Sequence, residues 1–207
     1  IRQLSSGEVM HSVNAPNDEA NTLYIEQSCL ASRLVRQPTP AEELVIWDVG
    51  LGAAFNAMAA IRCFERCYAE QGETALRPLR LVSIERDLDP LLLAAKLPDR
   101  FPHLRHSAPF KLLENGEWKH AAGLLHWELR KEDFCDGIER ASIPDLIFYD
   151  LFSAKSHASL WTAELFSRIF QRCALKSTEL YTYSASTAVR AALLVAGFFV
   201  AEGIGTG

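Results

Sequence analysis

Long hydrophobic runs are missing from this sequence of 207 residues. The longest uncharged apolar stretch, residues 191–201, is about half of the roughly 20 residues that a membrane-spanning helix requires. No positively charged segment followed by an apolar one opens the chain, so no secretory signal peptide is recognised. We therefore expect a cytoplasmic protein without a membrane span.

Cysteine is scarce, and its spacing is not that of a metal site. The five cysteines include no Cys-x-x-Cys motif. Cys63 and Cys67 lie four residues apart, and no His or Cys follows them at zinc-finger spacing. We therefore predict reduced thiols and no bound metal.

Positive charge is in the minority, with 21 Lys and Arg against 26 Asp and Glu and a net charge of −5. A protein that coats nucleic acid without specificity is basic, so the balance argues against that class and leaves only a local basic patch open. Hydrophobic residues make up 49% of the chain and charged residues 23%. These values are typical of a folded globular chain and exclude wholesale disorder.

Short apolar runs alternate with helical patterns along most of the chain. This alternation is typical of βαβ units and of a parallel sheet covered on both faces. We predict one α/β domain of Rossmann-like type over residues 44–207, with a helical N-terminal extension over residues 1–43 packed on it. The predicted strands are Leu44–Val49, Leu79–Ile84, Leu124–Leu129, Asp145–Tyr149, Glu179–Tyr183 and a sixth from Phe198. The predicted helices are Asn17–Leu34, Ala53–Gln71, Asp89–Lys96, Leu160–Cys173 and Ala185–Ala196, and the pattern assigns nothing to Pro102–Ala122.

A glycine turn follows the first predicted strand. Gly50 and Gly52 let the backbone turn sharply and approach a ligand closely. A dinucleotide loop would have a third glycine where Phe55 stands. The acidic Asp48 before the glycines repels a diphosphate and favours a cation, such as the sulfonium and ammonium groups of S-adenosylmethionine.

Acidic residues also end the next predicted strands. Glu85, followed by Arg86, can accept hydrogen bonds from both ribose hydroxyls of an adenosyl group. Asp133 can accept from an adenine amino group, and Phe134 can stack on the base. Asp150 follows a buried strand directly, a costly place for a carboxylate that has no partner or use.

The order of these residues resembles that of class I S-adenosylmethionine-dependent methyltransferases. More narrowly, the segment 50–56, which ends in Asn56, is similar to the glycine loop of MnmC-type methyltransferases, which act in tRNA wobble-base biosynthesis. The segment 150–166 is similar to a second motif of that family, and Ala196-Gly197-Phe198 is similar to a third. The resemblance runs from about Leu44 to the end of the chain.

The resemblance implies a cofactor, a reaction and a site. The cofactor is S-adenosylmethionine, and the reaction is N-methylation of an amine, with tRNA as the expected partner. Asp150 is the expected catalytic residue. The expected cofactor-binding residues are Asp48, Gly50, Gly52, Asn56, Glu85, Arg86, Asp133 and Phe134, and the expected substrate-binding residues are Phe152, Lys155, Trp161 and His11.

Two other functions stay open at this point. An aminopropyltransferase-like enzyme would use the same strand-end acids to hold a polyamine. A non-catalytic domain would bind S-adenosylmethionine without transferring its methyl group. The donor that protects the protein from heat distinguishes the first of these from a methyltransferase.

The resemblance further implies a seven-stranded sheet in the order 3-2-1-4-5-7-6. After the predicted sixth strand only the glycine-rich residues 203–207 remain. We therefore expect six strands in this chain and a seventh strand beyond Gly207.

Overall fold

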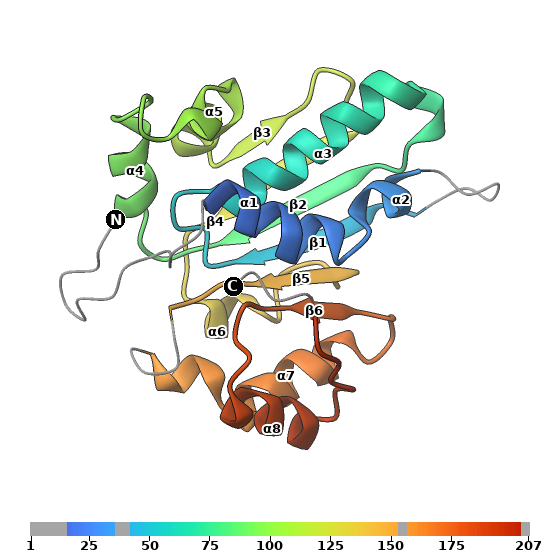
Figure 1. Ribbon diagram of the computed structural model, residues 1–207, viewed down its shortest axis with the longest axis vertical. Helices are drawn as coiled ribbons and strands as arrows, with labels where there is room; N and C mark the ends of the chain where they lie inside the picture. Colours follow the sequence, from blue (N-terminus) through green and yellow to red (C-terminus); the bar gives the residue numbers. More distant parts are fainter. Residues whose placement is uncertain (1–15, 36–41, 153–156, 204–207) are drawn as a thin grey trace.

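The computed structural model describes residues 16–35, 42–152 and 157–203. They form a six-stranded sheet in the order β3-β4-β2-β1-β5-β6 (Figure 1). The strands are β1 (Leu44–Val49), β2 (Leu79–Ile84), β3 (Glu117–Lys119), β4 (Leu125–Arg130), β5 (Leu146–Tyr149) and β6 (Glu179–Tyr181). The α-helices are α1 (Pro16–Ala20), α2 (Leu30–Leu34), α3 (Phe55–Gln71), α4 (Asp89–Ala95), α5 (Ser107–Asn115), α6 (Phe134–Gly137), α7 (Ala163–Cys173) and α8 (Thr187–Ala196).

The central strand β1 is buried on both faces and pairs in parallel with β2 and β5. Because alternate side chains of a strand point to opposite faces, β1 contributes to two cores. Leu44 and Ile46 pack with α1 to α5 on one face, and Trp47 and Val49 pack with α6 to α8 on the other (Figure 1). The molecule therefore has three layers, with the sheet between two layers of helices.

The predicted order 3-2-1-4-5 is confirmed, since it appears as β4-β2-β1-β5-β6. After β1 the chain crosses over to β2 on one side of β1, whereas β5 pairs with β1 on the other side. The order of strands therefore reverses between β1 and β5. In open α/β sheets, ligands bind beside the carboxyl ends of the strands at such a point.

The predicted sixth strand from Phe198 is wrong. Residues 198–200 form no strand, and Phe199 is fully exposed. The Phe198 amide instead donates to the Leu193 carbonyl and closes the end of α8. The sixth strand of the sheet is β3, which lies in the region without a sequence assignment and pairs antiparallel with β4 through a short hairpin. The expectation for the chain beyond Gly207 lies outside the described residues.

Two predicted helices differ from those in the structure. The predicted helix Asn17–Leu34 consists of α1, which continues into a π-helical turn (Asn21–Glu26), and of α2, which is separated from that turn because Cys29 has a left-handed backbone with φ of 51°. The predicted start of a helix at Leu160 is also wrong. A 3-10 turn occupies Ala158–Trp161, and α7 begins after Thr162, whose hydroxyl accepts from the Leu165 amide.

None of the helices in the described part of the chain is long and apolar enough to cross a membrane.

Candidate functional site

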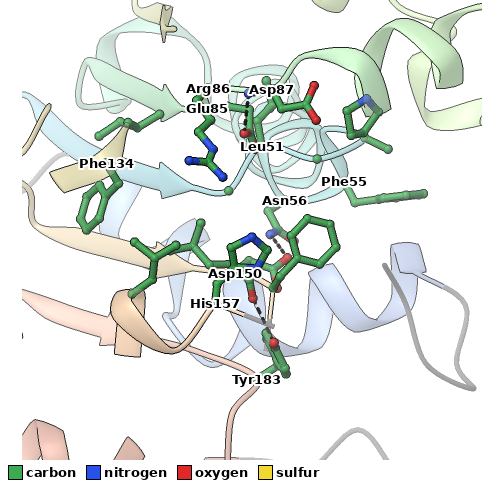
Figure 2. Close-up of a pocket in the computed structure, with 18 of the residues that line it drawn as sticks. Leu51, Phe55, Asn56, Glu85, Arg86, Asp87, Phe134, Asp150, His157 and Tyr183 are labelled. Atoms are coloured by element: carbon green, nitrogen blue, oxygen red, sulfur yellow. Dashed lines mark hydrogen bonds between the residues drawn. The ribbon is translucent and has the colours of Figure 1, made fainter. Parts of the chain in front are cut away.

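A cavity of about 420 Å³ opens at the carboxyl ends of the parallel strands. Its walls come from the segments that follow β1, β2, β4 and β5, and from the N-terminal segment around α1 (Figure 2). This volume lies in the range of sites for small molecules and cofactors. The cavity brings together nine of the residues predicted for the site, which are Gly50, Gly52, Asn56, Glu85, Arg86, Asp133, Phe134, Asp150 and Phe152.

Gly50 allows the loops after β1 and β5 to touch. Its φ is +91°, and a Cβ at this position would lie 2.5 Å from the backbone oxygen of Asp150. Ala54 completes the turn with a φ of 62°, a left-handed conformation that L residues adopt at a cost.

Asp48 lies behind the glycine loop and does not line the cavity. Its side chain is 1% exposed, and its Oδ2 accepts a 2.6 Å hydrogen bond from the Ser83 hydroxyl. That hydroxyl in turn accepts from the Trp127 indole at 2.8 Å. Among the described residues Oδ1 has no partner, and burial raises the pKa of Asp48 to about 7. Direct contact of Asp48 with the cofactor stays a prediction.

The raised pKa of Asp48 predicts a stability that depends on pH. The native state keeps this proton at pH values where the unfolded chain has lost it, so native stability rises as pH falls from about 7 toward 4. Asp48→Asn removes the buried charge, and we expect the variant to be about 1–3 kcal/mol more stable than the parent at about pH 8. Urea unfolding at several pH values measures this gain.

The gain of Asp48→Asn is expected to shrink as the pH falls toward 4. The matched control is Asp99→Asn, whose side chain is exposed and pairs with Arg105 on the surface. If Asp48→Asn raised the free energy of unfolding equally at about pH 8 and about pH 5, the buried charge of Asp48 would not be the cause.

The loops after β2 and β4 form one end of the cavity. The Glu85 carboxylate accepts from the Asp87 amide at 2.9 Å and also interacts with the Gly52 amide, while burial raises its pKa. Arg86 and Asp133 approach each other across the mouth at 3.5 Å. Phe134 is buried at the start of α6 and extends into this end of the cavity (Figure 2).

Asp150 stands at the point where the walls of the cavity meet. Asn56, from the first turn of α3, donates a 2.7 Å hydrogen bond to its Oδ2 (Figure 2). Burial raises the pKa of Asp150 to about 6, although the Asn56 amide opposes the shift. The sequence analysis assigns Asn56 to the cofactor, whereas the structure also places its amide on Asp150.

The N-terminal segment supplies a wall that the sequence analysis does not identify. Glu19, Leu23 and Tyr24 line the cavity, and α1 packs against α3. The apolar line along residues 17–34 indicates packing on the core but not which residues reach a ligand. Tyr24 resembles any other buried aromatic residue in that pattern, so no signal in the sequence distinguishes it.

Aromatic rings form the end of the cavity near β5. Phe152 and His157 stack with their ring centroids 5.5 Å apart, and the half-exposed Tyr183 donates to the Leu151 carbonyl at 2.9 Å. Trp161 lies behind this wall and not in it, since it is 5% exposed and packs against Tyr149. Its indole donates to the Phe152 carbonyl at 2.8 Å, which orients the wall.

Two predicted substrate residues, Lys155 and His11, lie outside the described residues. His157 and Tyr183 line the cavity instead and have no counterpart among the predicted residues.

The charges of the cavity fit S-adenosylmethionine. The charged residues among its described walls are six carboxylates and Arg86. Such a lining favours a cation and disfavours a diphosphate. Glu85 and Asp133 lie at one end, where their oxygens can accept from ribose hydroxyls and an adenine amino group. Phe134 lines the cavity as well, and Gly50 and Gly52 have no side chain beside the ligand.

Comparison with known proteins agrees with this geometry. Residues 105–207 match the family model described as S-adenosyl-L-methionine-dependent methyltransferase. Over 92% of its length the chain is 30% identical to the tRNA 5-methylaminomethyl-2-thiouridine biosynthesis bifunctional protein MnmC of Pseudomonas fluorescens, of which it covers 29%. The crystal structure of MnmC2 from Aquifex aeolicus has the same fold, with a TM-score of 0.71 and 22% identity over 99% of this chain and 63% of that chain.

The chain thus spans less than a third of the curated relative and less than two thirds of the solved one. The fold, the family model and the cavity nevertheless agree on the cofactor. Residues 105–207 thus match the S-adenosyl-L-methionine-dependent methyltransferases in sequence, and the whole chain has the fold of MnmC2 and a cavity that fits S-adenosyl-L-methionine.

Proposed function

We propose that this chain transfers a methyl group from S-adenosylmethionine to an amine, and that this amine is the aminomethyl group of a tRNA wobble uridine. The observation that carries the proposal is Asp150. It is a carboxylate at the carboxyl end of β5, held by Asn56, with a pKa raised to about 6 by burial. It lines the same cavity as the residues that fit an adenosyl group and as the aromatic residues Phe152 and His157.

The cofactor, when bound, supplies a methyl group on a sulfonium sulfur. We assign Gly50, Gly52, Glu85, Asp133 and Phe134 to hold it through the backbone, the ribose and the base. These residues line one end of the cavity. This leaves the region between Asp150 and Phe152 for the acceptor.

Asp150 accepts the proton that the acceptor amine releases in the reaction. An amine attacks with its lone pair, so the new N–C bond forms as the C–S bond breaks and the sulfur keeps the bonding pair. The nitrogen must then lose a proton, and Asp150 receives it. At neutral pH a carboxyl with a pKa of about 6 is mostly ionised, yet it is a stronger base than an exposed aspartate.

Two observations support tRNA as the source of the amine. The relative from Pseudomonas fluorescens is named for tRNA 5-methylaminomethyl-2-thiouridine biosynthesis. The stacked rings of Phe152 and His157 offer a flat surface beside Asp150, and stacking of a base on an aromatic side chain contributes about 1–3 kcal/mol. A cytoplasmic location stays a prediction from the sequence.

The test is methyl transfer from a labelled donor to bulk tRNA. We expect incorporation into tRNA from a strain that lacks this methylation and none into fully modified tRNA, with the label recovered in the wobble nucleoside. Heat protection of the protein by the donor is measured in parallel. Protection without incorporation into any amine would favour the non-catalytic alternative, and stronger protection by the decarboxylated donor would favour aminopropyl transfer.

A further inference from the structure

Tyr24 is a buried tyrosine of the N-terminal segment whose position is fixed from several sides. It lies within the π-helical turn Asn21–Glu26 and is 1% exposed. Its ring packs against Phe148 of β5 with the centroids 5.2 Å apart. The buried hydroxyl of Ser28 donates a 2.5 Å hydrogen bond to the Tyr24 carbonyl. Phe148 lies on this strand, two residues before Asp150, so Tyr24 is held against the base of the site.

The hydroxyl of Tyr24 lies near the Asp150 carboxylate. Among the described residues it makes no hydrogen bond of normal geometry. A buried hydroxyl without a partner is unfavourable, and π-helical turns are frequent at functional sites. The neighbouring charge with the strongest influence on this hydroxyl is that of Asp150, and each group shifts the pKa of the other.

We propose that Tyr24 is a positioning residue for methyl transfer, whose hydroxyl donates a hydrogen bond to the Asp150 carboxylate. This inference rests on the proposed function. With Asn56 on the other side, Asp150 then has one donor from α3 and one from the N-terminal segment. Two donors fix the plane of the carboxylate, so that a free lone pair faces the acceptor nitrogen.

The surroundings of Asp150 show why a second donor matters. Glu19 on α1 raises the pKa of Asp150, and Asp48 on β1 and Asp150 repel each other. Asn56 and Tyr24 oppose these groups and lower the pKa of Asp150. The phenol itself stays protonated, because burial and Asp150 raise its pKa well above the ordinary value. Tyr24 therefore acts as a donor and not as a base.

The experiment uses Tyr24→Phe, which keeps the ring on Phe148 and removes only the hydroxyl. The carboxyl band of Asp150 is followed by difference infrared titration and assigned with Asp150→Asn. We expect its midpoint to rise by roughly one pH unit, the effect of losing one hydrogen bond to a charged group. The pH at the midpoint of the acid limb of the turnover profile is expected to rise by the same amount. The affinity for the cofactor is expected to stay unchanged.

The matched control is Tyr68→Phe. Tyr68 lies in the second half of α3 and packs on Phe64 and His120, away from the cavity. It loses the same hydroxyl, and we expect no change in the Asp150 midpoint or in the pH profile. An unchanged midpoint in Tyr24→Phe, or an equal rise in both variants, would overturn the proposal.

A second variant is designed to shift the Asp150 titration midpoint to lower pH. Incorporation of 3-fluorotyrosine at position 24 gives a more acidic phenol and a stronger donor, so the Asp150 midpoint should fall below that of the parent. Both titrations are run with the protein alone and with S-adenosylhomocysteine, and neither needs an acceptor. They therefore test whether the hydrogen bond from Tyr24 to Asp150 exists, whatever the acceptor of the methyl group is. The pH profile of turnover can be measured with any amine that the enzyme methylates.

Discussion

Replacement of Asp150 by Asn is expected to lower turnover by about 10²–10⁴-fold, the usual contribution of a positioned acid–base group. The amide has the size of the carboxylate and can still accept from Asn56, but it cannot receive the proton of the acceptor. Affinity for S-adenosylmethionine is expected to change little. In the parent enzyme, turnover is expected to fall on the acid side of about pH 6, where Asp150 becomes protonated.

Single-turnover methyl transfer and equilibrium binding of the cofactor measure the two quantities separately. Asp99→Asn is the matched control, because it makes the same carboxylate-to-amide change on an exposed side chain away from the cavity. Turnover of Asp150→Asn within a factor of two or three of the parent would remove Asp150 from the proposed chemistry.

Replacement of Gly50 by Ala is expected to abolish cofactor binding and to reduce the free energy of unfolding by about 2–5 kcal/mol. The added Cβ would lie 2.5 Å from the Asp150 backbone oxygen, and the φ of +91° disfavours an L residue in any case. The loops after β1 and β5 must move apart to make room for the added Cβ. These two loops carry the glycine turn and Asp150, so one substitution disturbs both segments of the site.

Gly116→Ala is the control that introduces backbone strain without a clash. Gly116 has a similar φ of +76°, but a Cβ there meets nothing within 4 Å. We expect this control to lose about 1–2 kcal/mol from the left-handed conformation and to bind the cofactor normally. Chemical unfolding and calorimetric titration with S-adenosylmethionine compare the two variants. Equal losses in both would show that the contact with Asp150 is unimportant.

The alternation of apolar runs and helices was sufficient to predict the central sheet. Strands buried on both faces must be apolar along their length, so β1, β2 and β5 are visible as runs in the sequence. The edge strand β3 has exposed Glu117 and Lys119 around a half-buried Trp118 and lacks this signature. Phe198-Phe199-Val200 has the signature but no strand, because it closes α8 and leaves Phe199 in solvent.

The local chemistry of the strand ends also predicted much of the cavity. Parallel strands place their carboxyl ends at one edge of the sheet, so Gly50, Glu85, Asp133 and Asp150 had to lie near one another once the order of strands was known. Trp161 shows the limit of this argument. Whether a large ring lines a cavity or supports the wall behind it depends on packing, and no spacing in the sequence encodes that choice.

The sequence by itself determined the fold class, the edge of the sheet that carries the site and the acids along it, because strand periodicity and the residues at strand ends are local properties. Only the tertiary structure decided which residues complete the site. Tyr24 and Glu19 lie more than 120 positions from Asp150 in the chain, and they line the same cavity because the N-terminal segment packs against α3. The shifted pKa values of Asp48 and Asp150 arise in the same way, since burial is a property of the packed molecule and not of the local sequence.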